Sequence, residues 1–108
     1  MPKLTVRYTP QAIQDISDIA DYQNEHFPGS AERFEQRMKS IIERLAGAPR
    51  IGVPIGRDNI RKLTTNPFPY LVFYQVMEDA IVVLTIRHSA RDPATMPGGD
   101  TPDETDEP

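Results

Sequence analysis

Residues 66–93 read NPFPYLVFYQVMEDAIVVLTIRHSARDP, and this stretch decides the fold. It contains two apolar runs, Tyr70–Val76 and Ala80–Ile86, which are separated by Met77, Glu78 and Asp79. Runs of this length that are rich in Val, Ile, Tyr and Phe and are bounded by Pro and Ser are typical of β-strands. A short polar connection joins two such strands as an antiparallel hairpin. The stretch therefore predicts a β-hairpin.

Neither run alternates cleanly between apolar and polar residues. In the first run Leu71 and Phe73 point away from the face that Tyr70 occupies, and in the second Ile81 and Val83 point away from the remaining apolar residues. Strands that are apolar on both faces are usually covered on both faces. We therefore expect the hairpin to lie in the middle of a sheet.

The residues before the hairpin predict a strand over Lys3–Tyr8 and then two amphipathic helices. Thr9-Pro10 is typical of a helix start, and Phe27-Pro28-Gly29 separates the first helix from the second. Ala48–Asp58 is interpreted as a loop because it contains two Pro, two Gly and no periodicity, and Asn59–Thr65 as a strand near a sheet edge. The predicted fold is α+β, in the order β-α-α-β-β-β, with the helix hairpin on one face of a small, mostly antiparallel sheet.

Composition limits the class of protein. The chain has 108 residues, no Cys and no long apolar run, which predicts a single cytoplasmic domain with no disulfide and no membrane span. Its net charge of −4 is uneven, because residues 100–108 hold five acids and no base, whereas residues 1–99 hold 12 bases and 11 acids. We expect one domain over residues 1–95 and a disordered acidic tail over 96–108. The tail either keeps the protein in solution or shields a basic patch on the same molecule.

Two helices cover only one face of a sheet. The second face of the central hairpin should then present Leu71, Phe73, Ile81 and Val83 as an apolar patch. A large exposed apolar patch indicates a partner site. We therefore expect these four side chains to contact either a second copy or another protein. The alternative is that the sheet twists and the N-terminal segment or the loop over residues 48–58 covers them.

Polar residues gather where the second strand of the hairpin ends. Arg87, His88 and Arg91 follow one another there, and Arg61, Lys62 and Tyr70 are expected nearby. Arginine forks can hold phosphate and a histidine can move protons near neutral pH, but a structural role for a single histidine is the commoner one. Neighbouring strand residues point to opposite faces, so Arg87 and His88 share a site only if the strand has already ended. No metal-ligand spacing and no cofactor motif is present.

These elements resemble the ParE/RelE superfamily of toxins from type II toxin–antitoxin modules. The similarity covers about residues 4–93. The residues that carry it are Tyr8-Thr9-Pro10-Gln11-Ala12, Asp15-Ile16, Ile19-Ala20-Asp21-Tyr22, Ala31, Phe34, Leu45, Pro49, Arg61-Lys62-Leu63, Pro69-Tyr70-Leu71-Val72-Phe73-Tyr74 and Ile86-Arg87-His88-Ser89-Ala90-Arg91-Asp92-Pro93. The resemblance implies the fold order already reached and a cognate antitoxin as partner, a ParD-like ribbon-helix-helix protein in a hetero-oligomer.

The resemblance leaves three functions open. A ParE-like toxin of the plasmid-stabilisation kind would inhibit DNA gyrase by protein–protein contact, without catalytic residues, through Arg61, Lys62, Tyr70, Arg87, His88 and Arg91. A RelE-like toxin would cut mRNA on the ribosome with Arg61, Arg87 and His88, although no Tyr follows Tyr74 to match the late catalytic Tyr of that branch. The third possibility is a relic that binds an antitoxin without being toxic. The near-neutral body favours the ParE-like branch, with no membrane or direct nucleic-acid binding and no cofactor.

Overall fold

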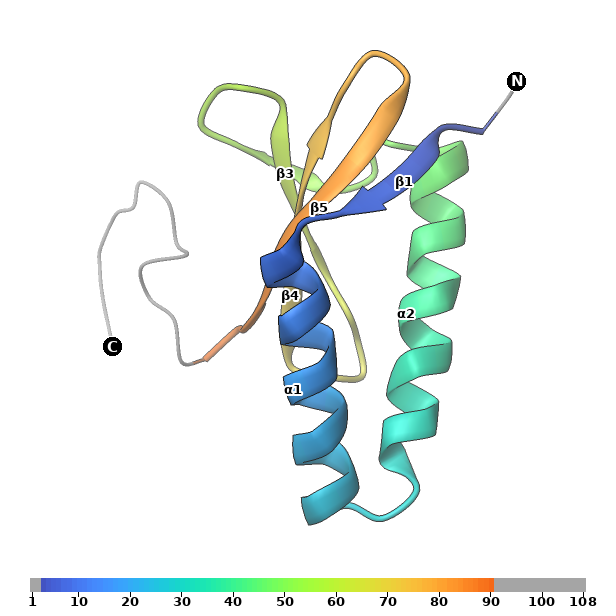
Figure 1. Ribbon diagram of the computed structural model, residues 1–108. Coiled ribbons are helices and arrows are strands. Elements are labelled where there is room, and N and C mark those ends of the chain that lie inside the picture. Colours follow the sequence, from blue (N-terminus) through green and yellow to red (C-terminus); the bar gives the residue numbers. More distant parts are fainter. Residues whose placement is uncertain (1–2, 91–108) are drawn as a thin grey trace.

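The computed structural model describes residues 3–90 as a helix hairpin packed on one face of a five-stranded sheet (Figure 1). Its elements are β1 (Thr5–Tyr8), α1 (Pro10–His26), α2 (Ser30–Gly47), β2 (Val53–Ile55), β3 (Ile60–Thr64), β4 (Tyr70–Val76) and β5 (Ala80–His88). The strands lie in the order β1-β5-β4-β3-β2, with β1 parallel to β5 and the other neighbours antiparallel. The predicted α+β class is confirmed, and so is the position of the β4–β5 hairpin in the middle of the sheet.

The predicted start of α1 is confirmed in atomic detail. Thr9 caps the helix, because its Oγ1 accepts a hydrogen bond from the Ala12 backbone N–H at 3.0 Å, and Pro10 occupies the first turn. The same hydroxyl donates to the Leu84 carbonyl oxygen on β5 at 2.7 Å. The cap therefore also fixes α1 against the sheet.

The predicted loop over Ala48–Asp58 contains a strand that the sequence pattern did not reveal. Val53–Ile55 forms β2, which pairs with β3 and takes the edge of the sheet, so β3 has neighbours on both sides. A strand of three residues with Pro54 at its centre shows no periodicity. Pro is tolerated there because an edge strand has one unpaired side.

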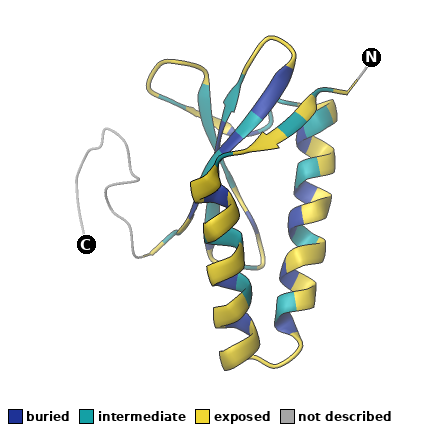
Figure 2. Cartoon of the chain, viewed as in Figure 1, coloured by how far each residue is buried: buried dark blue, intermediate teal, exposed yellow. Residues whose placement is uncertain are grey.

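The core lies between the helices and the sheet, and buried residues are confined to one side of each helix (Figure 2). The two helices contribute Ala12, Ile19, Phe34, Met38, Ile41 and Leu45, and the central hairpin contributes Tyr70, Val72, Tyr74, Ile81, Val83 and Ile86. The predicted orientation of Ile81 and Val83 is therefore wrong. Both are fully buried against the helices, with 0% of their surface exposed.

A register shift explains part of this error. The β4–β5 ladder pairs Tyr74 with Val83 but Phe73 with Thr85, so β5 carries one extra residue, Leu84. An extra residue reverses the alternation of side chains beyond it. Ile86 therefore shares the core face with Val83, although the two are an odd number of positions apart.

We call the other side of the sheet the rear face and define it by Arg7, Lys62, Leu71, Phe73, Gln75, Val82 and Arg87. Opposed residues in a ladder share a face, and the ladders pair Arg7 with Val82, Lys62 with Phe73 and Leu71 with Arg87. The wide exposed apolar patch predicted there is not found on the described residues. Phe73 is only 8% exposed and Leu71 and Val82 are half-buried.

Candidate functional site

The end of β5 brings together two of the predicted site residues, Tyr70 and His88. They are paired in the β4–β5 ladder, and their rings meet edge to face with centroids 5.5 Å apart. His88 Nδ1 accepts a hydrogen bond from the Ala90 backbone N–H at 3.1 Å. A ring nitrogen that accepts carries no proton, so the neutral ring bears its proton on Nε2.

Helix α1 closes over this pair and forms a small groove. The groove has a volume of about 160 Å³ and is lined by Asp18, Ile19, Tyr22, Tyr70 and His88. Sites for drug-sized ligands are usually about 300–1,000 Å³. The groove therefore fits a single side chain better than a whole small-molecule substrate.

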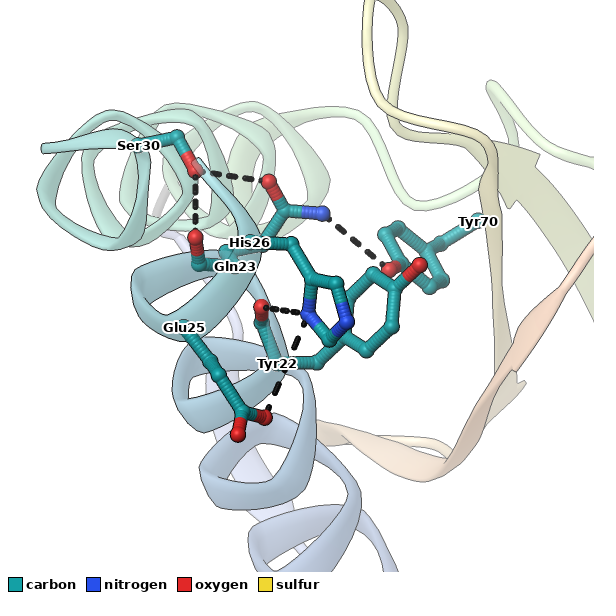
Figure 3. A network of polar contacts seen from close by, with 6 residues as sticks. All are labelled: Tyr22, Gln23, Glu25, His26, Ser30 and Tyr70. Carbon is teal, nitrogen blue, oxygen red and sulfur yellow. Dashed lines mark hydrogen bonds and ion pairs between the residues drawn. The ribbon is translucent and has the colours of Figure 1, made fainter. Parts of the chain in front are cut away.

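A buried polar network orients the Tyr70 ring, as Figure 3 shows. Gln23 Nε2 donates to Tyr70 Oη at 3.2 Å, and Ser30 Oγ donates to Gln23 Oε1 at 2.7 Å. Gln23 and Ser30 are both buried, so an unmade hydrogen bond would carry a desolvation cost. The network ties the α1–α2 turn to the first residue of β4.

His26, the second histidine, lies in the last turn of α1. Its Nδ1 is 3.0 Å from the Tyr22 carbonyl oxygen, and its ring stacks on Tyr22 with centroids 4.1 Å apart (Figure 3). Because a carbonyl only accepts, Nδ1 carries the proton in this contact. These contacts give His26 a local role at the helix end, where the dipole favours a basic group.

Asp15 joins α1 to β5, a role that the sequence did not predict. Its Oδ2 accepts from Thr85 Oγ1 at 2.6 Å and from the Ile86 backbone N–H at 3.0 Å. Strand β1 pairs with β5 only as far as Val83. Beyond that point the Asp15 carboxylate accepts the Ile86 backbone hydrogen bond in place of a neighbouring strand. Asp15 is therefore half-buried and faces the sheet, whereas Asp18 and Asp21 on the same helix are exposed.

Arg61 lies at the other end of the sheet, where it donates hydrogen bonds to backbone carbonyls. Its Nη1 donates to the carbonyl oxygens of Arg50 at 3.1 Å and Gly52 at 2.7 Å. Beside it, Tyr74 Oη donates to the Pro49 carbonyl at 2.8 Å and accepts from the Gly52 N–H at 2.8 Å. Burial raises the pKa of Tyr74, although the Gly52 hydrogen bond and the Arg61 charge act in the opposite direction. Arg61 and Tyr74 together hold residues 49–52 on the sheet.

The three residues of the ribonuclease hypothesis are not brought together. Arg61 pairs with Tyr74 and His88 with Tyr70, which places them four residues apart along β4, or about 13 Å. Strand β5 continues to His88, so Arg87 and His88 point to opposite faces. His88 lies on the helix side with Tyr70, and Arg87 lies on the rear face with Leu71.

The rear face holds the remaining predicted residues that the structure describes. Lys62 and Arg87 flank Leu71 and Phe73, whereas Ile81 and Val83 offer no surface there. The five strands contain Arg7, Arg61, Lys62 and Arg87 and no acid, α1 contains four acids and no Lys or Arg, and α2 contains charges of both signs. The rear face is therefore apolar at its centre, basic at its sides and free of carboxylates within its strands.

Two predictions fall on residues outside the described part. Arg91 lies there, as does the acidic tail over 96–108. Among residues 3–90 no group of three His, Cys, Asp or Glu side chains is placed to hold a metal ion. No helix in that part of the chain is both long enough and apolar enough to cross a bilayer.

Gln23 and Asp15 are the site residues that sequence reasoning missed. Gln23 interrupts the stripe of Ala12, Ile16 and Ile19 at a helical spacing of four, and a polar residue at such a position signals a buried hydrogen bond. Nothing in the local sequence separates Asp15 from the other acids of α1. Its partners on β5 are about 70 residues away.

Comparisons of the sequence and the structure with known proteins identify the family that has this fold. The sequence model of the family described as "ParE toxin of type II toxin-antitoxin system, parDE" matches residues 6–93. Toxin RelE2 of Caulobacter vibrioides is 33% identical over 86 residues, which cover 80% of this chain and 96% of that relative.

Solved structures share the fold at low identity. The chromosomal ParDE system of P. aeruginosa matches with a TM-score of 0.68 and 20% identity, over 80% of this chain and 96% of that one. A double mutant of the E. coli toxin RelE in the free state matches with a TM-score of 0.64 and 16% identity, over 83% and 88% of the two chains. The fold, the family match and the relative agree, and the chain belongs to the ParE toxin family of type II toxin–antitoxin systems.

Proposed function

We propose that this toxin acts in the ParE manner, by inhibiting DNA gyrase through protein–protein contact, and that a cognate ParD-like antitoxin of the ribbon-helix-helix class neutralises it. The toxin domain of this proposal spans residues 1–95. The observation that carries the mode of action is the separation of Arg61, Arg87 and His88. A ribonuclease needs its phosphate-holding and proton-transferring groups within hydrogen-bond reach of one substrate.

The contacts of the separated residues support the same proposal. Arg61 donates to two backbone carbonyls, and His88 Nδ1 accepts from the Ala90 backbone N–H. Residues 3–90 hold 11 Lys and Arg against 10 Asp and Glu, so the body has almost no net charge. A protein that contacts many phosphates usually carries a clear excess of bases.

The rear face is the surface that we assign to the antitoxin. The half-buried side chains of Leu71 and Val82 supply its accessible apolar surface around the buried Phe73, with Lys62 and Arg87 beside Leu71 and Phe73. Interfaces of this kind place apolar contacts at the centre and charged contacts at the rim. An antitoxin segment with apolar residues flanked by acids would complement it.

A ribosome-dependent ribonuclease of the RelE kind is the second candidate. The absence of acids from the five strands favours it, because the strand cations then face a polyanion without repulsion from the sheet. In this case the protein contacts RNA, and His88 is the group that moves protons.

The experiment expresses the chain alone and then with its neighbouring antitoxin gene. Loss of supercoiling by purified gyrase, with intact mRNA, supports the proposed function. Cleaved mRNA that disappears in His88→Ala but persists in the matched control His26→Ala refutes it in favour of the second candidate. Normal growth without the antitoxin refutes both and leaves a non-toxic antitoxin-binding relic.

A further inference from the structure

The rear face and the end of the chain have opposite charges. The rear face carries Arg7, Lys62 and Arg87, and no strand of the sheet contains an acid. Residues 100–108 read DTPDETDEP, with five acids and no base. Within residues 3–90, α1 contains four acids and no Lys or Arg, so it would repel such a segment.

The geometry points to the rear face as an intramolecular docking site for the chain's own acidic residues 100–107. The docking does not require that the chain be toxic; only its regulatory consequence rests on the proposed function. The acidic segment places carboxylates beside Lys62 and Arg87, and it lies over the surface assigned above to the antitoxin. A partner then has to displace it.

The length of the chain allows this contact. The last described residue, Ala90, lies two residues after the end of β5, and Asp100 comes ten residues later. Ten residues reach up to about 33–36 Å when extended. Strands β3 and β5, which carry Lys62 and Arg87, are two strand spacings apart, or about 10 Å.

The tether compensates for weak individual charge pairs. Exposed ion pairs contribute little each, and salt screens them. A connection of about ten residues, however, holds the acids at an effective concentration of the order of mM. The contact is therefore populated at low salt, is sensitive to salt and is readily displaced.

Paramagnetic relaxation tests the docking in the full chain. The sequence has no cysteine, so Thr105→Cys provides a single site for a nitroxide label. Methyl signals of Leu71 and Val82 report on the rear face, and those of Ile41 and Leu45 on α2 serve as the reference. At low salt we expect the label to quench the rear-face methyl signals strongly and the reference signals weakly.

Matched variants identify the cause of the quenching. Replacing the five tail acids by their amides (Asp100→Asn, Asp103→Asn, Glu104→Gln, Asp106→Asn, Glu107→Gln) abolishes the differential quenching. About 1 M salt does the same, because it reduces the Debye length to about 3 Å. Lys62→Gln and Arg87→Gln each weaken it, whereas Lys39→Gln on α2 leaves it unchanged.

Three results overturn the docking. The first is equal quenching of the rear-face and reference methyl signals, and the second is differential quenching that survives in the amide variant or at high salt. The third is quenching in a mixture where the label and the isotopes are on different molecules, since the contact then joins two copies. None of these readouts involves gyrase, mRNA or an antitoxin. A result that refutes the docking can therefore be distinguished from one that refutes the proposed function.

Discussion

The Tyr74 hydroxyl is the best single test of how residues 49–52 are held on the sheet. Tyr74 is fully buried, and its hydroxyl bonds both the Pro49 carbonyl and the Gly52 N–H at 2.8 Å. Tyr74→Phe keeps the ring in the core but removes a partner from each of these groups. An unsatisfied buried group costs about 1–3 kcal/mol, so we expect the free energy of unfolding to fall by about that amount.

Urea unfolding measures this loss directly, and calorimetry provides a second readout. For a domain of 60–100 residues, 1 kcal/mol corresponds to about 4–8 °C in Tm. Tyr22→Phe is the matched control, because the Tyr22 side chain is exposed and its ring contact with His26 does not use the hydroxyl. If the two variants differ by less than about 0.5 kcal/mol, the two hydrogen bonds do not stabilise the loop and the reasoning is wrong.

The pH dependence of the free energy of unfolding provides an independent test of the role assigned to Tyr74. Burial raises the pKa of Tyr74 above its ordinary value of 10.0, so the folded state keeps the hydroxyl proton to higher pH than the unfolded state does. The resulting stabilisation is fully present below pH 10 and decreases as pH rises through the folded pKa. The stability advantage of the wild type over Tyr74→Phe should therefore narrow above pH 10, and an advantage that widens there would contradict this assignment.

Two further substitutions test the α1–sheet junction and the loop that precedes β2. Asp15→Ala leaves the Ile86 N–H without its carboxylate and should lower the free energy of unfolding by about 1–3 kcal/mol in urea, against little change for the exposed control Asp21→Ala. Gly52→Ala places a methyl group 2.5 Å from a tyrosine hydroxyl and 2.7 Å from a backbone oxygen, and should cost about 1–3 kcal/mol or more. A Cβ at Gly47 meets nothing within 4 Å, so Gly47→Ala should stabilise by about 0.4–1 kcal/mol in the same assay, and equal effects at the two glycines would contradict this account.

Local chemistry made most of the fold predictable. The Thr9-Pro10 start, the Pro28-Gly29 break and the apolar hairpin each act over a few residues, so the sequence reveals them directly. The predictions failed where contacts between residues distant in the sequence determine which side chains are buried. Ile13 belongs to the apolar pattern that predicts the amphipathic helix α1, yet its side chain is 58% exposed, because the sheet lies toward Ala12 and Ile19 instead.

The candidate site was less predictable than the fold for the same reason. The extra residue Leu84 on β5 changes which side chains face the helices, and nothing in a run of Val, Leu and Ile marks that position. The end of β5 was correctly identified as a place where Tyr70 and His88 meet. Arg61 lies far from Tyr70 and His88 because it pairs with Tyr74 on β4. The sequence does not reveal which residues of β3 and β4 are paired.

The parallel pairing of β1 with β5 determines when this protein can complete its fold. Thr5 is opposite Ala80 and Tyr8 is opposite Val83, so β1 can pair with β5 only after the ribosome has synthesised residues 80–83. At about 5–20 residues per second, those partners are separated by several seconds of synthesis. Until then the helix hairpin has no complete sheet to cover, and a chain interrupted before residue 80 lacks β5, the strand that joins β1 to β4. Premature termination therefore yields a fragment that cannot complete the sheet.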